Sequence, residues 1–233
     1  MYSMMDAHPS TVIVVVGTTL VTPLYLLATF VFSGASARKG LLVAVAALVF
    51  ATVQFWVCLS DLPGRLGLPG NAVVPAAWIL PTILLLLFRR WVLSDPLSQR
   101  WLVGLQLFRA IGAVFLVEMA RGNLPGVFAY PAGVGDVAVA CIALAVLLRY
   151  RGQRIPRGAV LLVVLAGLAD FISAFFFGFT SSETPLQLFF PVIPNDVTSF
   201  PTGMIPLFLV PYAIFFHFLS WWNYLLHEKK PHA

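Results

Sequence analysis

Three ionisable side chains lie deep inside long apolar stretches of the sequence. Arg109 falls in the run 101–120, Asp170 in 158–179 and His217 in 203–226. Ionisable residues inside apolar spans are costly, usually face the interior of a helix bundle and are functional candidates. At a helical rise of about 1.5 Å per residue, all three come near mid-membrane. We therefore expect their side chains to reach one another if their helices are neighbours.

The helix faces that carry Arg109 and Asp170 are otherwise formed by small or polar residues, which allow helices to approach closely in a membrane. These neighbours are Gln106, Gly112 and Ala113 around the arginine, and Ala166, Gly167, Ser173 and Ala174 around the aspartate. Two interpretations stand. In one, the site binds an anionic or protonatable ligand, with Arg109 as anion clamp and Asp170 as counter-ion or proton carrier. In the other, an Arg109–Asp170 ion pair holds helices together without further function.

Two further acids, Glu118 and Asp136, flank a stretch rich in turn residues. Pro131, Gly133 and Gly135 precede Asp136, which predicts a break in the chain followed by a new helix. An acidic side chain at a helix start caps free N–H groups and complements the helix dipole. The alternative is that this glycine-rich helix start contacts the anionic group of a ligand. Both acids join Gln106, Arg109, Asp170 and His217 as candidate ligand-binding residues.

The segment QLFRAIGAVFLVEMARGNLPGVFAYPAGVGD, residues 106–136, contains the pattern FRxxG followed by LPGxFAxPAGxGD. This segment resembles a signature of bacterial multi-pass membrane proteins that have no assigned activity. The resemblance implies a bacterial cytoplasmic membrane and makes Arg109 and Asp136 parts of one element. It implies no chemistry.

Retinal and zinc sites do not fit the sequence. A retinal Schiff base needs an intramembrane lysine, whereas Lys39, Lys229 and Lys230 all flank the apolar runs. A catalytic zinc takes three protein ligands, and His8, His227 and His232 lie outside or at the edge of the runs, which leaves His217 alone. The sequence therefore predicts no metal site.

His217 has three remaining interpretations. It forms a packing hydrogen bond with a neighbouring helix, it carries ligand or proton chemistry, or it is the single axial ligand of a haem. Nucleophilic catalysis has no local support, because GxSxG is absent and no serine shares a motif with His217 and a carboxylate. We therefore do not favour an enzyme, and a lipid-modifying membrane enzyme is kept as a third alternative.

The elements that must position these residues are transmembrane helices. The chain of 233 residues is 60% hydrophobic and 10% charged, with a mean hydropathy of +0.94. Seven apolar runs approach or exceed the roughly 20 residues that cross a bilayer, and none shows the alternation of a barrel strand. We predict an all-α membrane protein with a single domain over 1–233, whose spans are 11–32, 41–60, 72–90, 101–120, 132–150, 158–179 and 203–226.

Basic residues give the orientation. Eleven of the 14 lie on one side: Arg38, Lys39, Arg89, Arg90, Arg100, Arg149, Arg151, Arg154, Arg157, Lys229 and Lys230. Cytoplasmic loops carry the excess of Lys and Arg, so we expect the N-terminus outside and the C-terminus in the cytoplasm. The scattered clusters between apolar runs do not resemble a nucleic-acid surface, so no nucleic-acid partner is expected.

Two features of organisation stay open at this point. Pro81, Phe88 and Trp91 recur at identical spacing as Pro211, Phe218 and Trp221, which suggests a 3+1+3 parallel repeat. The outer segment 180–202 is a lid over a cavity in one interpretation, and a loop with aromatic side chains at headgroup level in the other.

Together these observations favour a transporter, or a protein that binds a small solute or proton, in the bacterial inner membrane. Its polar site would comprise Arg109, Asp170 and His217. A protein that binds haem or another cofactor through His217 is the alternative. Membrane lipid and a small molecule or proton are the expected partners.

Overall fold

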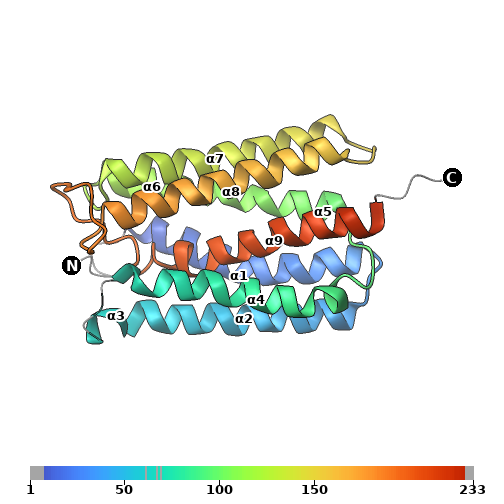
Figure 1. The fold of residues 1–233 in the computed structure, drawn as a ribbon, viewed down its shortest axis with the longest axis horizontal. Helices are drawn as coiled ribbons and strands as arrows, with labels where there is room; N and C mark the ends of the chain where they lie inside the picture. Colours follow the sequence, from blue (N-terminus) through green and yellow to red (C-terminus); the bar gives the residue numbers. More distant parts are fainter. Residues whose placement is uncertain (1–7, 61, 67, 69, 229–233) are drawn as a thin grey trace.

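The computed structural model describes residues 8–60, 62–66, 68 and 70–228, and within them the secondary structure is entirely helical (Figure 1). Seven helical spans are long and apolar enough to cross a membrane. Four of them are single helices: α1 (Pro9–Phe32), α2 (Ala37–Ser60), α7 (Gly126–Arg149) and α8 (Arg157–Thr180). The short helix α3 (Leu62–Arg65) follows α2.

The other three spans are composite. The third joins η1 (Gly70–Val73) to α4 (Val74–Val92), and the fourth joins α5 (Gln99–Gly104), η2 (Leu105–Gly112) and α6 (Ala113–Ala120). The seventh joins η3 (Ile205–Leu209), α9 (Val210–Asn223) and η4 (Tyr224–Glu228). The chain is thus an all-helical protein of the multi-pass membrane type, as the apolar runs predict.

The fifth span differs from the prediction. Helix α7 begins at Gly126 instead of residue 132, and Pro131 lies inside it. Asp136 is therefore ten residues into the helix, so the prediction that it caps a helix start is wrong. Transmembrane helices tolerate Pro and Gly that would break a soluble helix, because neighbouring groups satisfy the freed backbone.

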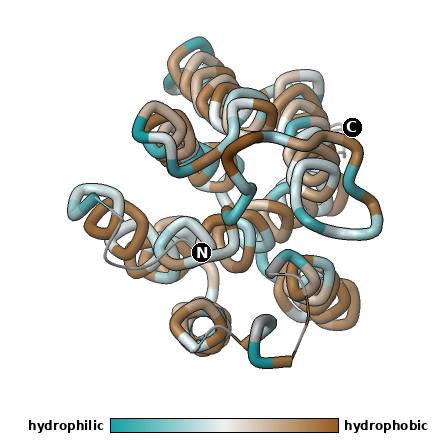
Figure 2. The backbone as a smooth tube through the Cα atoms, turned by 90° about the vertical axis from the view of Figure 1, so that its left-hand side faces the viewer, coloured by the Kyte–Doolittle hydropathy of each residue, from teal (hydrophilic) through white to brown (hydrophobic). Residues whose placement is uncertain are grey.

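The seventh and fourth spans form the core of the bundle. Within their most apolar windows, 72% and 61% of the residues are buried, compared with 22% for the second and third spans. Helix α9 packs against α4, α8 and α5, while α7 packs against α8, η2 and α6. Viewed along the bundle, the helices are predominantly hydrophobic (Figure 2).

The two ends of the bundle differ. The turns after α1, α4 and α7 share one end of the bundle (Figure 1). We call it the basic end, because eight arginines flank these turns: Arg38, Arg89, Arg90, Arg100, Arg149, Arg151, Arg154 and Arg157. Lys229 and Lys230, predicted on the same side, lie outside the described residues. Segment 181–204 marks the opposite, long-loop end (Figure 1).

At the basic end, buried Asn223 fastens α9 to the chain before α5. Its amide oxygen accepts from the Leu97 N–H and its amide nitrogen donates to the Leu97 carbonyl, both at 2.8 Å. These bonds fix the seventh span relative to the start of the fourth at the basic end, further toward that end than Arg109 and His217.

Candidate functional site

A buried guanidinium at the centre of the bundle joins four helical elements. Arg109, on η2, is 1% exposed. Its Nε donates to Asp136 Oδ1 on α7 at 2.7 Å, and its Nη2 donates to Asp170 Oδ2 on α8. Its Nη1 lies 3.4 Å from the Gly167 carbonyl and 3.4 Å from His217 Nε2 on α9. We call Arg109, Asp136, Asp170 and His217 the charge cluster.

The local winding of the fourth span places Arg109 in this position. Residues Leu105–Gly112 form a 3-10 helix, which has three residues per turn and is rarely longer than three or four residues. Side chains three apart therefore lie in one row, so Gln106, Arg109 and Gly112 share a face. This long 3-10 segment directs Arg109 and Gly112 together at Asp136 on α7.

Three glycines let these elements approach one another. A Cβ at Gly112 would overlap Asp136, and one at Gly133 would come 2.9 Å from the Gly112 carbonyl oxygen. A Cβ at Gly135 would overlap Asp170 Oδ1. Close backbone approach through glycine thus brings the carboxylates of α7 and α8 to the same guanidinium.

Aromatic and backbone groups of α8 and α9 complete the surroundings. The Arg109 guanidinium carbon lies 3.9 Å from the centre of the Phe171 ring, and Phe171 meets the His217 ring edge to face at 6.0 Å. A Cβ at Gly167 would overlap His217 Nε2. Arginine can only donate, so His217 Nε2 is the acceptor in its contact with Nη1, which makes the imidazole neutral with its proton on Nδ1.

A small cavity adjoins the two carboxylates on the side of the long-loop end. It encloses about 50 Å³, and its lining includes Asp136, Asp170, Asn71, Val197 and Thr198. Asn71 is 6% exposed, and its amide Nδ2 has no hydrogen-bond partner among the described residues. Most of the lining is aromatic or aliphatic, with Asp136, Asp170, Asn71 and Thr198 as its polar residues. A cavity of this size has room for about three water molecules, which need such polar partners.

Comparison with known proteins identifies a family. A domain of unknown function (DUF8737) matches residues 65–225. The chain belongs to this family. Neither the search of curated proteins nor that of solved structures gave a match. The DUF8737 match includes the whole charge cluster and all of segment 106–136.

Within this DUF8737 chain, the two ends of segment 106–136 meet in space. Arg109 and Gly112 of the FRxxG part contact Asp136, while Gly133 of the GxGD part packs on the backbone of Gly112. Gly135 then accommodates the carboxylate of Asp170 from α8. These two short patterns are therefore a single packing and ion-pairing unit.

Not every residue singled out in the sequence belongs to the cluster. Gln106 is 1% exposed, and neither atom of its amide has a hydrogen-bond partner among the described residues. Glu118 instead accepts from Thr11 Oγ1 and from Asn123 Nδ2, the latter at 2.7 Å. Glu118 thus links α6 to α1 nearer the long-loop end.

Phe171 and Asn71 contribute to the site, although neither was predicted from the sequence. Phe171 directly follows Asp170, and its ring lies over the guanidinium that Asp170 accepts from. Asn71 precedes an apolar run and has the appearance of an ordinary turn residue. The presence of Asn in the first turn of a span was its only signal.

The surroundings of His217 do not fit a haem bound through Nε2. That nitrogen faces the Arg109 guanidinium and the backbone of Gly167, where an iron atom would have to be. Neither the cavity beside the carboxylates nor the larger groove described below is lined by His217. We therefore derive no haem chemistry from this site.

Proposed function

We propose that this protein binds and translocates protons through the charge cluster, as the proton-carrying part of a membrane transporter. The observation that carries the proposal is the buried pair of carboxylates, Asp136 and Asp170, on one guanidinium, with a small cavity beside them. In a coupled transporter of this kind, a small molecule would move together with the proton.

The charges of the cluster support one exchangeable proton. Arg109 is permanently charged, and His217 is neutral in the observed contact, so two ionised aspartates leave a net charge of −1. Uncompensated charge is costly at this depth. Binding one proton makes the cluster neutral, and two carboxylates that share a site characteristically titrate as a pair.

Arg109 is suited to holding the pair and not to binding an external anion. All three of its nitrogens donate hydrogen bonds within the cluster or to Gly167, and Phe171 covers one face of the guanidinium. An incoming anion would have to displace a carboxylate. We therefore assign Arg109 as the fixed counter-ion of the two carboxylates. His217 is assigned as the acceptor of a hydrogen bond from Arg109 Nη1.

The cavity supports exchange of this proton toward the long-loop end. One oxygen of each carboxylate bonds to Arg109, and the second oxygens, Asp136 Oδ2 and Asp170 Oδ1, have no hydrogen-bond donor among the described residues. Water in the cavity would supply those donors and would also accept from Asn71 Nδ2. Val197 and Thr198 cover the cavity from segment 181–204, which in this proposal acts as its lid.

Infrared difference spectroscopy of the purified protein between two pH values tests proton binding without a known substrate. We expect a carboxylic-acid C=O band that changes in Asp170→Asn and in Asp136→Asn. Glu183→Gln is the matched control, because Glu183 is an exposed carboxylate at the long-loop end. A difference spectrum identical in wild type and both aspartate variants would refute the assignment.

Proton translocation is tested in vesicles that contain a pH-sensitive dye and an imposed membrane potential. We expect wild-type protein to conduct protons and Asp170→Asn to slow the flux by about a hundredfold or more, the lower end of the effect of a positioned acid–base group on proton transfer. Glu183→Gln should match wild type. Absence of flux in the wild type would restrict the proposal to proton binding.

Orientation and location are part of the same proposal. The concentration of arginine at the basic end favours this end in the cytoplasm of a bacterial inner membrane, with segment 181–204 outside. The cavity would then open toward the outer side. Attachment of a membrane-impermeant reagent to Glu183→Cys in intact cells would establish which side the long-loop end faces.

A further inference from the structure

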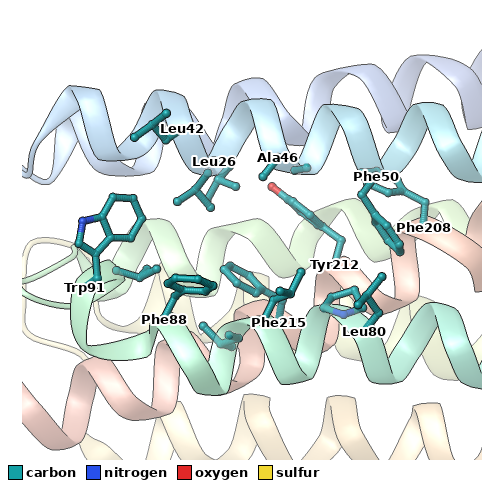
Figure 3. A pocket seen from close by; sticks show the side chains of 16 residues that line it. Leu26, Leu42, Ala46, Phe50, Leu80, Phe88, Trp91, Phe208, Tyr212 and Phe215 are labelled. Carbon is teal, nitrogen blue, oxygen red and sulfur yellow. The ribbon is translucent and has the colours of Figure 1, made fainter.

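A second, larger hollow lies on the flank of the bundle, away from the charge cluster. It has a volume of about 430 Å³, within the usual range of ligand pockets. Helices α2 and α4 form its sides and α9 its floor, with Leu42, Ala46 and Phe50 facing Leu80, Phe88 and Phe215 (Figure 3). We call this hollow the lateral groove.

The lateral groove exists because α2 and α4 pack on different partners. Helix α2 packs along α1 and α4 packs along α9, while α2 and α4 make few direct contacts. Lys39, in the first turn of α2, closes the gap at the basic end by donating to Asp95 at 3.0 Å and to Ser94. Between this link and the middle of the bundle, the groove is open to the side.

The groove lining is almost entirely hydrocarbon and aromatic. Its two side chains with polar atoms are Trp91, at the basic end, and Tyr212, whose hydroxyl donates to the Thr22 carbonyl. No serine, cysteine, histidine or carboxylate belongs to this lining. Such a surface has nothing to hold a polar headgroup and no nucleophile to modify one.

Its length matches one leaflet of a bilayer. The lining of α4 runs from Leu80 to Val92, a rise of twelve residue steps or about 18 Å along the helix axis. Half of a hydrocarbon core of about 30 Å is about 15 Å. The groove therefore covers the depth of a single acyl chain, from the basic end to about mid-membrane.

Basic side chains at the same end of the bundle as the groove supply charge for a lipid phosphate, and one of them, Arg89, lies 5.6 Å from the ring centre of Trp222 on α9. Arg38 and Lys39 lie in the first turn of α2, and Arg89 and Arg90 in the last turn of α4. Asp95 neutralises one of these four cations. The remaining charge of +3 is complementary to an anionic headgroup, and cationic clusters at this level attract anionic lipids.

We propose that the lateral groove binds one acyl chain of an anionic phospholipid from the leaflet at the basic end. The chain enters sideways between α2 and α4, and the phosphate lies among the arginines of the two helix ends. Trp91 lies at the level of the glycerol esters, where tryptophan is commonly found in membrane proteins. The site is separate from the charge cluster and independent of the proposed proton function.

Native mass spectrometry of the full chain, titrated with dioleoylphosphatidylglycerol or dioleoylphosphatidylcholine, tests the proposal. Ala46→Trp should fill the groove, because Ala46 lies at its exposed edge. Displacing about two buried methylenes of the chain lowers affinity by about tenfold. Ala145→Trp is the matched control, since Ala145 is also exposed and lies on α7, which contributes no residue to the groove.

The preference for an anionic headgroup is tested separately, by replacing arginines at the basic end. Arg38→Gln combined with Arg89→Gln should remove the preference for phosphatidylglycerol over phosphatidylcholine while leaving acyl-chain binding in place. Arg149→Gln with Arg151→Gln removes two charges at the same end, at the close of α7 and just beyond it, and should retain the preference. Folding of each variant is checked by its elution profile.

Two results would overturn the inference. One is equal phospholipid occupancy in wild type and a folded Ala46→Trp variant. The other is a wild-type dimer that Ala46→Trp converts to monomer without loss of lipid, because the groove would then be covered by a second copy of the chain.

Discussion

Gly135→Ala adds one methyl group at the tightest point of the charge cluster. The new Cβ would overlap Asp170 Oδ1, so the carboxylate has to move. It cannot move without disturbing a hydrogen bond, because its other oxygen accepts from Arg109. The substitution therefore acts on the ion pair although neither charged residue is changed.

The expected loss of stability has three contributions. Overpacking a filled interior costs about 1–3 kcal/mol. Weakening the hydrogen bond between the guanidinium and Asp170 costs a further 1.5–3 kcal/mol or so, as for bonds to charged groups. Replacing glycine by alanine inside a helix returns about 0.5–1 kcal/mol. The net effect is a destabilisation of roughly 2–5 kcal/mol.

Equilibrium unfolding in mixed detergent micelles measures this change, with Gly17→Ala as the matched control. Gly17 lies inside α1 and a Cβ there meets nothing within 4 Å, so this variant should gain stability by about 0.5–1 kcal/mol. A Gly135→Ala protein as stable as the Gly17→Ala control would refute the packing described for the cluster.

A double-mutant cycle identifies the source of the loss. In an Asp170→Ala background the carboxylate is absent, so the added methyl at residue 135 has no oxygen to displace. We expect the cost of Gly135→Ala to fall there, with a coupling of about 0.5–3 kcal/mol. A cost unchanged by Asp170→Ala would place the effect elsewhere in α7.

Three further outcomes follow from the described contacts. Arg109→Gln should destabilise the protein by about 3–5 kcal/mol in the same unfolding assay, because it leaves two buried carboxylates without their cation. Asn223→Ala should cost about 1–3 kcal/mol for each of the two buried Leu97 backbone groups it leaves unpaired, measured in the same way. The hydrogen bond from Lys39 lowers the pKa of Asp95 below its usual 3.8. The contribution of the Lys39–Asp95 pair to stability should therefore be complete above pH 3.8 and disappear as the pH falls through the lowered pKa of Asp95. The melting temperatures of wild type and Asp95→Asn should accordingly converge in acid.

The residues of the site that the sequence revealed are those whose burial is chemically expensive. Arg109, Asp170 and His217 were evident because each interrupts an apolar run, and the structure brings all three together. The small residues Gly112 and Gly167 were also recognised on the faces of the charged residues. The apolar runs similarly fixed the positions of the seven spans to within a few residues at most ends.

Asp136 shows where local patterns mislead. Pro131 and the glycines before it have the composition of a turn, but in a membrane helix the glycines serve close packing and the proline is tolerated. The contribution of Asp136 depends on which helix lies opposite, and this is decided by packing over the whole bundle. For the same reason the sequence could not reveal the covering of Arg109 by Phe171. The 3+1+3 repeat stays a prediction.

The 3-10 winding of Leu105–Gly112 ties the ion pairs to the length of the fourth span. Eight residues extend about 16 Å as a 3-10 helix and about 12 Å as an α-helix. Rewinding this segment would therefore shorten the span by about 4 Å and rotate Gly112 by roughly 120° relative to Gln106. Arg109 would then turn away from Asp136 while the two ends of the span were drawn together. The length of the fourth span and the ion pair between Arg109 and Asp136 are therefore coupled, because the same winding extends the span and directs the guanidinium at Asp136.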